Sequence, residues 1–144
     1  MRFSIRTIVC LVLVGLLFQT VVFGAASPDY KTTKTLLDTS QTVIGEDILY
    51  PGGGQARIKA MVVVLEPGER TVWHRHGVPL YAYLLAGDLE LDYGPAGKRI
   101  YHSGDNFMEA MTEFHQGHNI GSDEVRILAV FMGGEGQPLV IPKE

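Results

Sequence analysis

Residues 71–76 read TVWHRH and place two histidines, His74 and His76, one residue apart just before an apolar segment. Side chains two positions apart in a β-strand point to the same face. A His-x-His pair on a strand therefore directs two imidazoles toward one point, where a metal ion can join them. Helical metal motifs space their ligands three or four residues apart. The spacing here predicts strands with a metal site on one face.

A third histidine, His115, follows about forty positions after this pair, and Asn119 comes four residues beyond it. A histidine from a different strand would complete one face of a metal site. We therefore predict that His74, His76 and His115 are metal ligands. Two other interpretations stay open: the pair can be exposed residues at a strand end beside Arg75, and the third can be a loop histidine held by its neighbours.

The first residues have the pattern of a secretory signal peptide. Arg2 and Arg6 precede an apolar run at residues 8–23, and three small residues at 24–26 offer a cleavage site. The run is shorter than the ~20 residues of a membrane-spanning helix, so cleavage is favoured over a retained anchor. We predict that residues 1–26 are removed and that the protein is exported to the periplasm or outside the cell, with no stable membrane insertion after cleavage.

The mature chain has the size and charge of one small acidic domain. Removing residues 1–26 from the 144-residue chain leaves 118 residues, which is enough for one core. The single cysteine, Cys10, is lost with the signal peptide, so the mature chain has neither a disulfide nor thiol chemistry. It contains 10 basic and 16 acidic residues, and this negative net charge argues against a nucleic-acid partner. We expect a flexible N-terminal arm at residues 27–34 and one domain at 35–144.

After residue 34 the pattern is β throughout. Short segments rich in β-branched residues or alternating in polarity are separated by glycine and proline turns, and no convincing helical period is present. Predicted strands lie at residues 35–37, 42–44, 47–50, 57–65, 71–76, 80–85, 88–93, 98–101, 107–110, 115–119 and 125–132. Many short strands of this kind predict an all-β sandwich or barrel.

The histidines and their flanking glycines resemble the two motifs of the cupin superfamily. The first motif is Gly, five residues, His-x-His, three or four residues, Glu, six residues, Gly; here Gly68 and Gly87 frame the His-x-His pair. The second is Gly, five residues, Pro-x-Gly, two residues, His, three residues, Asn; Gly104, His115 and Asn119 match it, with Ala110 and Thr112 in place of Pro and Gly. The resemblance implies a double-stranded β-helix, or jelly-roll, barrel.

The sequence departs from the family at the usual glutamate ligand. Depending on the spacing, Leu80 or Tyr81 stands at that position, and neither carries a carboxylate. Glu109, at the end of a predicted strand in an apolar context, is the candidate replacement. A carboxylate there is costly unless it meets water, a cation or hydrogen-bond donors. We name Glu109 as a candidate metal ligand and candidate catalytic residue; orienting a histidine or pairing with an arginine are the alternatives.

Three imidazoles with one carboxylate suit a divalent transition metal: iron, zinc, manganese, nickel or copper. We favour an exported small cupin that binds such a metal together with a small organic ligand, because the usual glutamate is replaced. The alternative is a metal-dependent dioxygenase or isomerase acting on a small oxygen-rich compound, which the three histidines and Glu109 support. The sequence leaves catalysis open. The resemblance also implies a homodimer as a candidate assembly.

Overall fold

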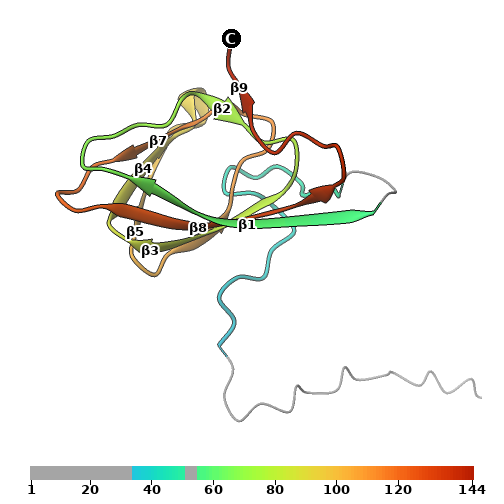
Figure 1. Ribbon diagram of the computed structural model, residues 1–144, viewed down its shortest axis with the longest axis horizontal. Coiled ribbons are helices and arrows are strands. Elements are labelled where there is room, and N and C mark those ends of the chain that lie inside the picture. Colours follow the sequence, from blue (N-terminus) through green and yellow to red (C-terminus); the bar gives the residue numbers. More distant parts are fainter. Residues whose placement is uncertain (1–33, 51–54) are drawn as a thin grey trace, which may run out of the picture. The chain divides into compact units, whose positions relative to one another are not determined.

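The strands pair into three antiparallel sheets in the computed structural model, which describes residues 34–50 and 55–144. A four-stranded sheet has the order β1-β8-β3-β6, and a three-stranded sheet has the order β5-β4-β7. Strands β2 and β9 form a small third sheet, which lies at the top of the view in Figure 1. The predicted signal peptide at 1–26, and all but the last residue of the predicted arm at 27–34, lie outside the described residues.

From residue 56 onward the strand bounds agree with the sequence pattern, except that the predicted strand at 71–76 is limited to His74–Arg75 and the strand at Ile141–Pro142 was not predicted. The strands are β1 (Ala56–Leu65), β2 (His74–Arg75), β3 (Leu80–Ala86), β4 (Asp88–Asp92), β5 (Lys98–His102), β6 (Asn106–Met108), β7 (Gln116–Asn119), β8 (Val125–Gly134) and β9 (Ile141–Pro142). The described residues contain no α-helix and only one short 3-10 turn, Gly94–Ala96. The prediction of an all-β fold is therefore confirmed. None of the helices among these residues has the length and apolar character needed to cross a membrane.

The predicted strands before residue 50 are wrong. Residues 34–50 contain no strand, and only Gln41 and Asp47 form an isolated β-bridge. The Thr42 hydroxyl accepts a hydrogen bond from the backbone of Glu46 (3.1 Å) and donates to its carboxylate (3.0 Å). Such local side-chain bonds give the backbone an alternative to a ladder. A turn replaces the predicted strands here.

Apolar and polar residues alternate along β4, and the apolar ones form part of the core. Leu89 and Leu91 are 1% and 5% exposed, whereas Asp88, Glu90 and Asp92 between them are only partly buried, as the alternating pattern predicted. Full burial of a leucine side chain contributes about 1.5–3 kcal/mol. In β1 the alternation is present only at the end of the strand, where Val63 and Leu65 are partly or fully buried and Val62 and Val64 are exposed. The core therefore lies between the two larger sheets.

Two motif residues fix the turns that frame the site. Gly87 has a φ of +83°, and a Cβ on it would lie 2.8 Å from the carbonyl oxygen of Glu124, so only glycine fits between β3 and β4. The buried Asn119 side chain donates to the carbonyls of Leu65 (2.9 Å) and Asp123 (2.8 Å), and it accepts from the Gly121 backbone (2.9 Å). Both residues therefore support the structure.

Candidate metal centre

The fold brings His74, His76 and His115 into one cluster. The backbones of His74 and His115 exchange two hydrogen bonds, of 3.0 and 2.8 Å, so β2 lies directly beside the start of β7. The three ring centroids are 4.6–5.0 Å apart. One nitrogen from each ring lies within 4.8 Å of the others. The sequence prediction that these three imidazoles meet is confirmed.

Backbone carbonyls fix the protonation of each ring. The Nδ1 atoms of His74, His76 and His115 lie 2.8, 3.0 and 3.0 Å from the carbonyl oxygens of Val72, Leu139 and Glu113. A carbonyl oxygen can only accept, so each Nδ1 carries a proton and donates it. A neutral imidazole with this tautomer has its lone pair on Nε2. All three rings thus offer Nε2 as a ligand atom.

The Nε2 atoms converge at a distance that a metal ion fits. Those of His76 and His115 are 3.3 Å apart. With both lone pairs directed there, the two nitrogens cannot form a hydrogen bond with each other, and a shared cation would remove their repulsion. Two nitrogens bound tetrahedrally at about 2.0–2.1 Å from zinc lie about 3.3–3.4 Å apart. The donor set and the spacing therefore fit a bound divalent ion.

Burial keeps the histidines neutral. It lowers the pKa of His76 to about 3, with the neighbouring His115 adding to the effect. Burial also lowers the pKa of His74 and of His115, although the hydrogen bonds to Val72 and Glu113 act in the opposite direction. Neutral imidazole is the form that binds metals. Near neutral pH the three imidazoles are therefore in the uncharged form that can bind a cation.

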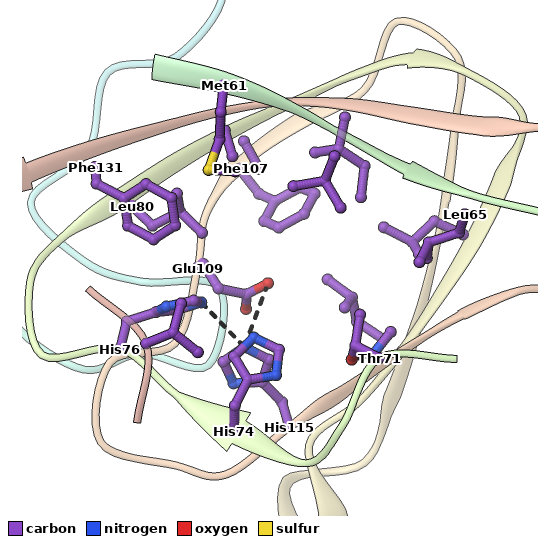
Figure 2. A pocket seen from close by; sticks show the side chains of 18 residues that line it. Met61, Leu65, Thr71, His74, His76, Leu80, Phe107, Glu109, His115 and Phe131 are labelled. Atoms are coloured by element: carbon purple, nitrogen blue, oxygen red, sulfur yellow. Dashed lines mark hydrogen bonds and ion pairs between the residues drawn. The ribbon is translucent and has the colours of Figure 1, made fainter. Parts of the chain in front are cut away.

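Glu109 lies beside the cluster with one carboxylate oxygen directed at it (Figure 2). Its Oε1 accepts hydrogen bonds from the Tyr93 hydroxyl (2.6 Å) and the Ala110 backbone (2.8 Å), whereas Oε2 lies 3.9 Å from Nε2 of His115. Burial raises the pKa of Glu109 to about 7, and the bonds from Tyr93 and Ala110 limit the rise. The partners of this carboxylate are thus a tyrosine and a backbone amide, which argues against the arginine-pairing alternative.

Tyr93 was not recognised from the sequence as part of the site. It is fully buried, and burial together with the charge of Glu109 raises its pKa, so it stays protonated and donates. The alternation at residues 88–93 placed Tyr93 on the buried face, which is the only signal that could have found it. Its contact with Glu109 joins positions 16 residues apart and is not visible in the pattern.

Leu80 occupies the place beside the histidines where the family motif has glutamate. Its side chain is buried and lines a cavity that also contains the three histidines and Glu109. It lies next to Phe131, whose ring centroid is 5.5 Å from that of His76. Tyr81, the alternative position, does not line the cavity and is paired with Met108 on β6. An apolar wall therefore replaces a carboxylate at this position.

The C-terminal segment completes the site, which the sequence did not predict. Leu139 supplies the carbonyl that holds His76, Val140 lines the cavity, and β9 pairs with β2. A Cβ on Gly77 would lie 2.4 Å from the carbonyl oxygen of Pro138, so the segment passes directly against the turn after His76. These contacts tie the His-x-His pair to the end of the chain.

The other two histidines lie outside the cavity. His102 is exposed and its Nδ1 lies 2.7 Å from Oδ1 of Asp88. His118 lies 4.0 Å from Glu90 and does not line the cavity.

Between β2 and β9 at one end and Leu65 at the other, the cavity has a volume of about 180 Å³. It is lined by Met61, Val63, Leu65, Thr71, His74, His76, Leu80, Ala82, Leu89, Leu91, Phe107, Glu109, His115, Gly117, Ile127, Ala129, Phe131 and Val140.

Comparisons with known proteins agree with this fold. Residues 61–131 match the family model described as "Cupin domain". An oxalate decarboxylase from Lactobacillus farciminis, solved as a formate complex, aligns with a TM-score of 0.53 and 22% identity over 61% of this chain and 27% of its own. An uncharacterized conserved protein with a double-stranded β-helix domain from Klebsiella pneumoniae subsp. pneumoniae MGH 78578 aligns with a TM-score of 0.51 and 15% identity, over 67% of this chain and 86% of its own.

An oxalate oxidase in complex with the substrate analogue glycolate aligns with a TM-score of 0.50 and 17% identity, over 58% of this chain and 45% of its own. This chain therefore spans about a quarter of the length of the decarboxylase and less than half of the oxidase. No curated protein matches the sequence. At these identities the structural likeness concerns the fold alone.

Proposed function

Because the chain contains a cupin domain, we propose that this domain binds one divalent transition-metal ion together with a small organic ligand. Nε2 of His74, His76 and His115 would hold the ion. One observation carries this proposal: three buried imidazoles, each with Nδ1 fixed to a carbonyl, direct their unprotonated nitrogens into one space. A hydrogen bond from the other ring nitrogen to a carbonyl, which orients the imidazole, is typical of metal-binding histidines.

The metal is one that imidazole binds well. Zinc, iron, nickel, copper and manganese all fit three nitrogens with one carboxylate nearby. Glu109 would add a negative charge and a fourth ligand atom, Oε2, from the side on which it faces His115. When bound, such an ion supplies Lewis acidity, which polarises an oxygen atom of a ligand beside it.

The chain's own residues prepare the space beside the ion. Tyr93 and the Ala110 amide hold Oε1 of Glu109, which keeps Oε2 directed at the histidines. Leu80 and Phe131 form apolar walls next to His76 and exclude water from that side. The cavity then receives a small molecule beside the histidines and Glu109.

A metal-dependent dioxygenase or isomerase is the second candidate function. The observation that favours it is Glu109, whose pKa is raised to about 7 by burial and which therefore exchanges protons near neutral pH. Replacing Glu109 by glutamine separates the two candidates. An enzyme would lose its rate while it keeps its ligand, whereas a binding protein would lose affinity alone.

Export and self-association are further proposals. The residue 1–26 pattern supports export, and mass spectrometry of the mature N-terminus tests it. Strand β1 supports a homodimer: it is the edge of the four-stranded sheet, and among the described residues it pairs with β8 alone. Its outward residues Ile58, Val62 and Val64 are 61%, 44% and 44% exposed. An apolar edge of this kind needs covering.

A second copy of the chain suits this edge. Basic Arg57 and Lys59 lie at one end of β1, and acidic Glu66 and Glu69 follow its other end. Antiparallel pairing of two β1 strands around a two-fold axis would place the basic end of each copy beside the acidic end of its partner. This arrangement is self-complementary, as a two-fold interface must be.

Metal analysis tests the main proposal. The protein is purified without an affinity tag and its metal content is measured beside that of a His74→Ala/His76→Ala double variant. We expect close to one metal ion per wild-type chain and none in the double variant. The matched control is His102→Ala, which removes an exposed histidine and is expected to keep the metal. A wild-type protein that takes no metal after reloading contradicts the proposal.

A further inference from the structure

The cavity has its charged and metal-binding groups at one end only. In Figure 2 the three imidazoles and the Glu109 carboxylate lie together, while Leu65 marks the opposite end. Of the 18 residues that line the cavity, these four and Thr71 are polar. Aliphatic and aromatic side chains form the rest of the wall. Apart from the Thr71 hydroxyl, which accepts a hydrogen bond from the Gly117 backbone, a ligand that fills this space therefore meets polar side chains only at the end with the histidines and Glu109.

None of the described residues that line the cavity is a lysine or an arginine. Arg75, between the two histidines, points to the other face of its strand and lies 5.3 Å from the ring centroid of Phe114. Burying an ionised carboxylate or phosphate without a partner charge is very costly. Three neutral imidazoles, one carboxylate and one divalent cation would leave a single positive charge, which balances one negative charge and no more.

The size of the cavity limits the apolar part of the ligand. An engineered cavity of ~150 Å³ lined by leucine, isoleucine and phenylalanine stays dry and binds benzene. The cavity here is slightly larger, at about 180 Å³, and its wall away from the histidines is of the same kind, with Leu91, Phe107 and Ile127. One six-membered ring, or an aliphatic body of similar volume, therefore fits.

We propose that the ligand is a small molecule with a compact apolar body and a single oxygen head group that is neutral or carries one negative charge, such as a phenol. Dicarboxylates and phosphate esters are excluded by the missing cationic side chain. The position of the head group at the histidines rests on the proposed metal function. The apolar character of the body rests on the cavity wall alone.

Fluorine NMR on the protein with and without zinc tests this inference. The probes are 4-fluorophenol and 4-fluorophenyl phosphate, which share one ring and differ in the charge of the head group, and oxalate is added as a competitor without an apolar body. We expect saturable binding of 4-fluorophenol at least about tenfold tighter than that of the phosphate ester or of oxalate. Zinc content is measured in every sample after dialysis, because oxalate itself binds metals.

A matched pair of variants locates the probe. Ala129→Phe fills the cavity and is expected to abolish 4-fluorophenol binding, whereas Ala96→Phe adds the same ring to the exposed turn Gly94–Ala96 and is expected to leave binding unchanged. If Ala129→Phe does not fold, the relative affinities of the wild-type protein for the three probes still test the proposed ligand class.

The two proposals fail in different ways. A protein that takes no zinc but still prefers 4-fluorophenol refutes the metal function and supports the apolar ligand class. A zinc-loaded protein that prefers oxalate or the phosphate ester supports the metal function and overturns the ligand class. Absence of 4-fluorophenol binding in both forms also overturns it.

Discussion

Replacing Glu109 by glutamine is expected to remove a pH-dependent loss of stability from the metal-free protein. Burial raises the pKa of Glu109 from the ordinary 4.5 to about 7 in the folded state. Between these two values the folded chain holds a proton that the unfolded chain releases. Stability falls with rising pH wherever the folded state binds more protons. The contribution of Glu109 is therefore complete below about pH 4.5 and is lost as pH rises through about 7.

The size of this loss follows from the two pKa values. Each factor of ten in proton affinity is about 1.4 kcal/mol, so the difference between 4.5 and about 7 corresponds to about 3 kcal/mol. The three histidines act in the opposite direction, because burial lowers the pKa of each of them. Both proteins contain these histidines, so their contribution largely cancels in the difference between wild type and variant.

Urea denaturation of both proteins in the presence of a chelator, at several pH values from 5 to 8, measures this difference. We expect the stability advantage of wild type over Glu109→Gln to decrease by about 2–3 kcal/mol across this range. Tyr93→Phe removes the 2.6 Å hydrogen bond to Oε1, so it should move the loss to higher pH. An advantage that stays constant with pH, or grows with it, refutes the account of Glu109 as a buried carboxylate.

Three further outcomes are expected. Gly77→Ala places a Cβ 2.4 Å from the Pro138 carbonyl oxygen, so it should cost about 1–3 kcal/mol in urea denaturation and weaken zinc binding measured by calorimetry. The carboxylate of Glu46 accepts hydrogen bonds from Thr112. Burial raises the pKa of Glu46, but these hydrogen bonds lower it by more, so the pKa lies below its ordinary value. Glu46→Gln should therefore cost about 1 kcal/mol of stability at pH 7, and less as pH falls below 4.5. Val62→Lys should convert a dimer to a monomer in light scattering.

Each of these results has an outcome that contradicts it. Unchanged stability and zinc affinity in Gly77→Ala would show that the C-terminal segment moves away without cost. A Glu46→Gln effect that grows in acid would show that the carboxylate is not the stabilising form. A wild-type protein that is monomeric at all concentrations would end the proposal of a β1 interface.

Local patterns in the sequence were enough to predict the parts of the site that depend on spacing. The two-residue period of a strand placed His74 and His76 on one side, and the second motif placed His115 beside them. The alternation at residues 88–93 likewise predicted which face of β4 is buried. In these places one short segment determines the geometry by itself, so no knowledge of distant contacts was needed.

Other parts of the site depend on contacts between distant segments that leave no pattern. The carbonyl of Leu139 holds His76 across 63 positions, and a backbone group carries no sequence signal. Strand β9 is two residues long and includes Pro142, so no period could reveal it. The orientation of Glu109 depends on Tyr93 binding one of its two oxygens, which only the folded structure shows. The turn at residues 42–46 overrode a β-branched pattern through its own side-chain bonds.

Imidazole nitrogen NMR during a zinc titration tests the three-histidine metal centre directly. We expect His74, His76 and His115 to keep the Nδ1–H tautomer set by their carbonyl partners, and their three Nε2 resonances to shift together and saturate at one zinc ion per chain. The exposed His102 should not respond. Shifts at Nδ1, or binding that involves fewer than three of these rings, would contradict a three-histidine metal centre.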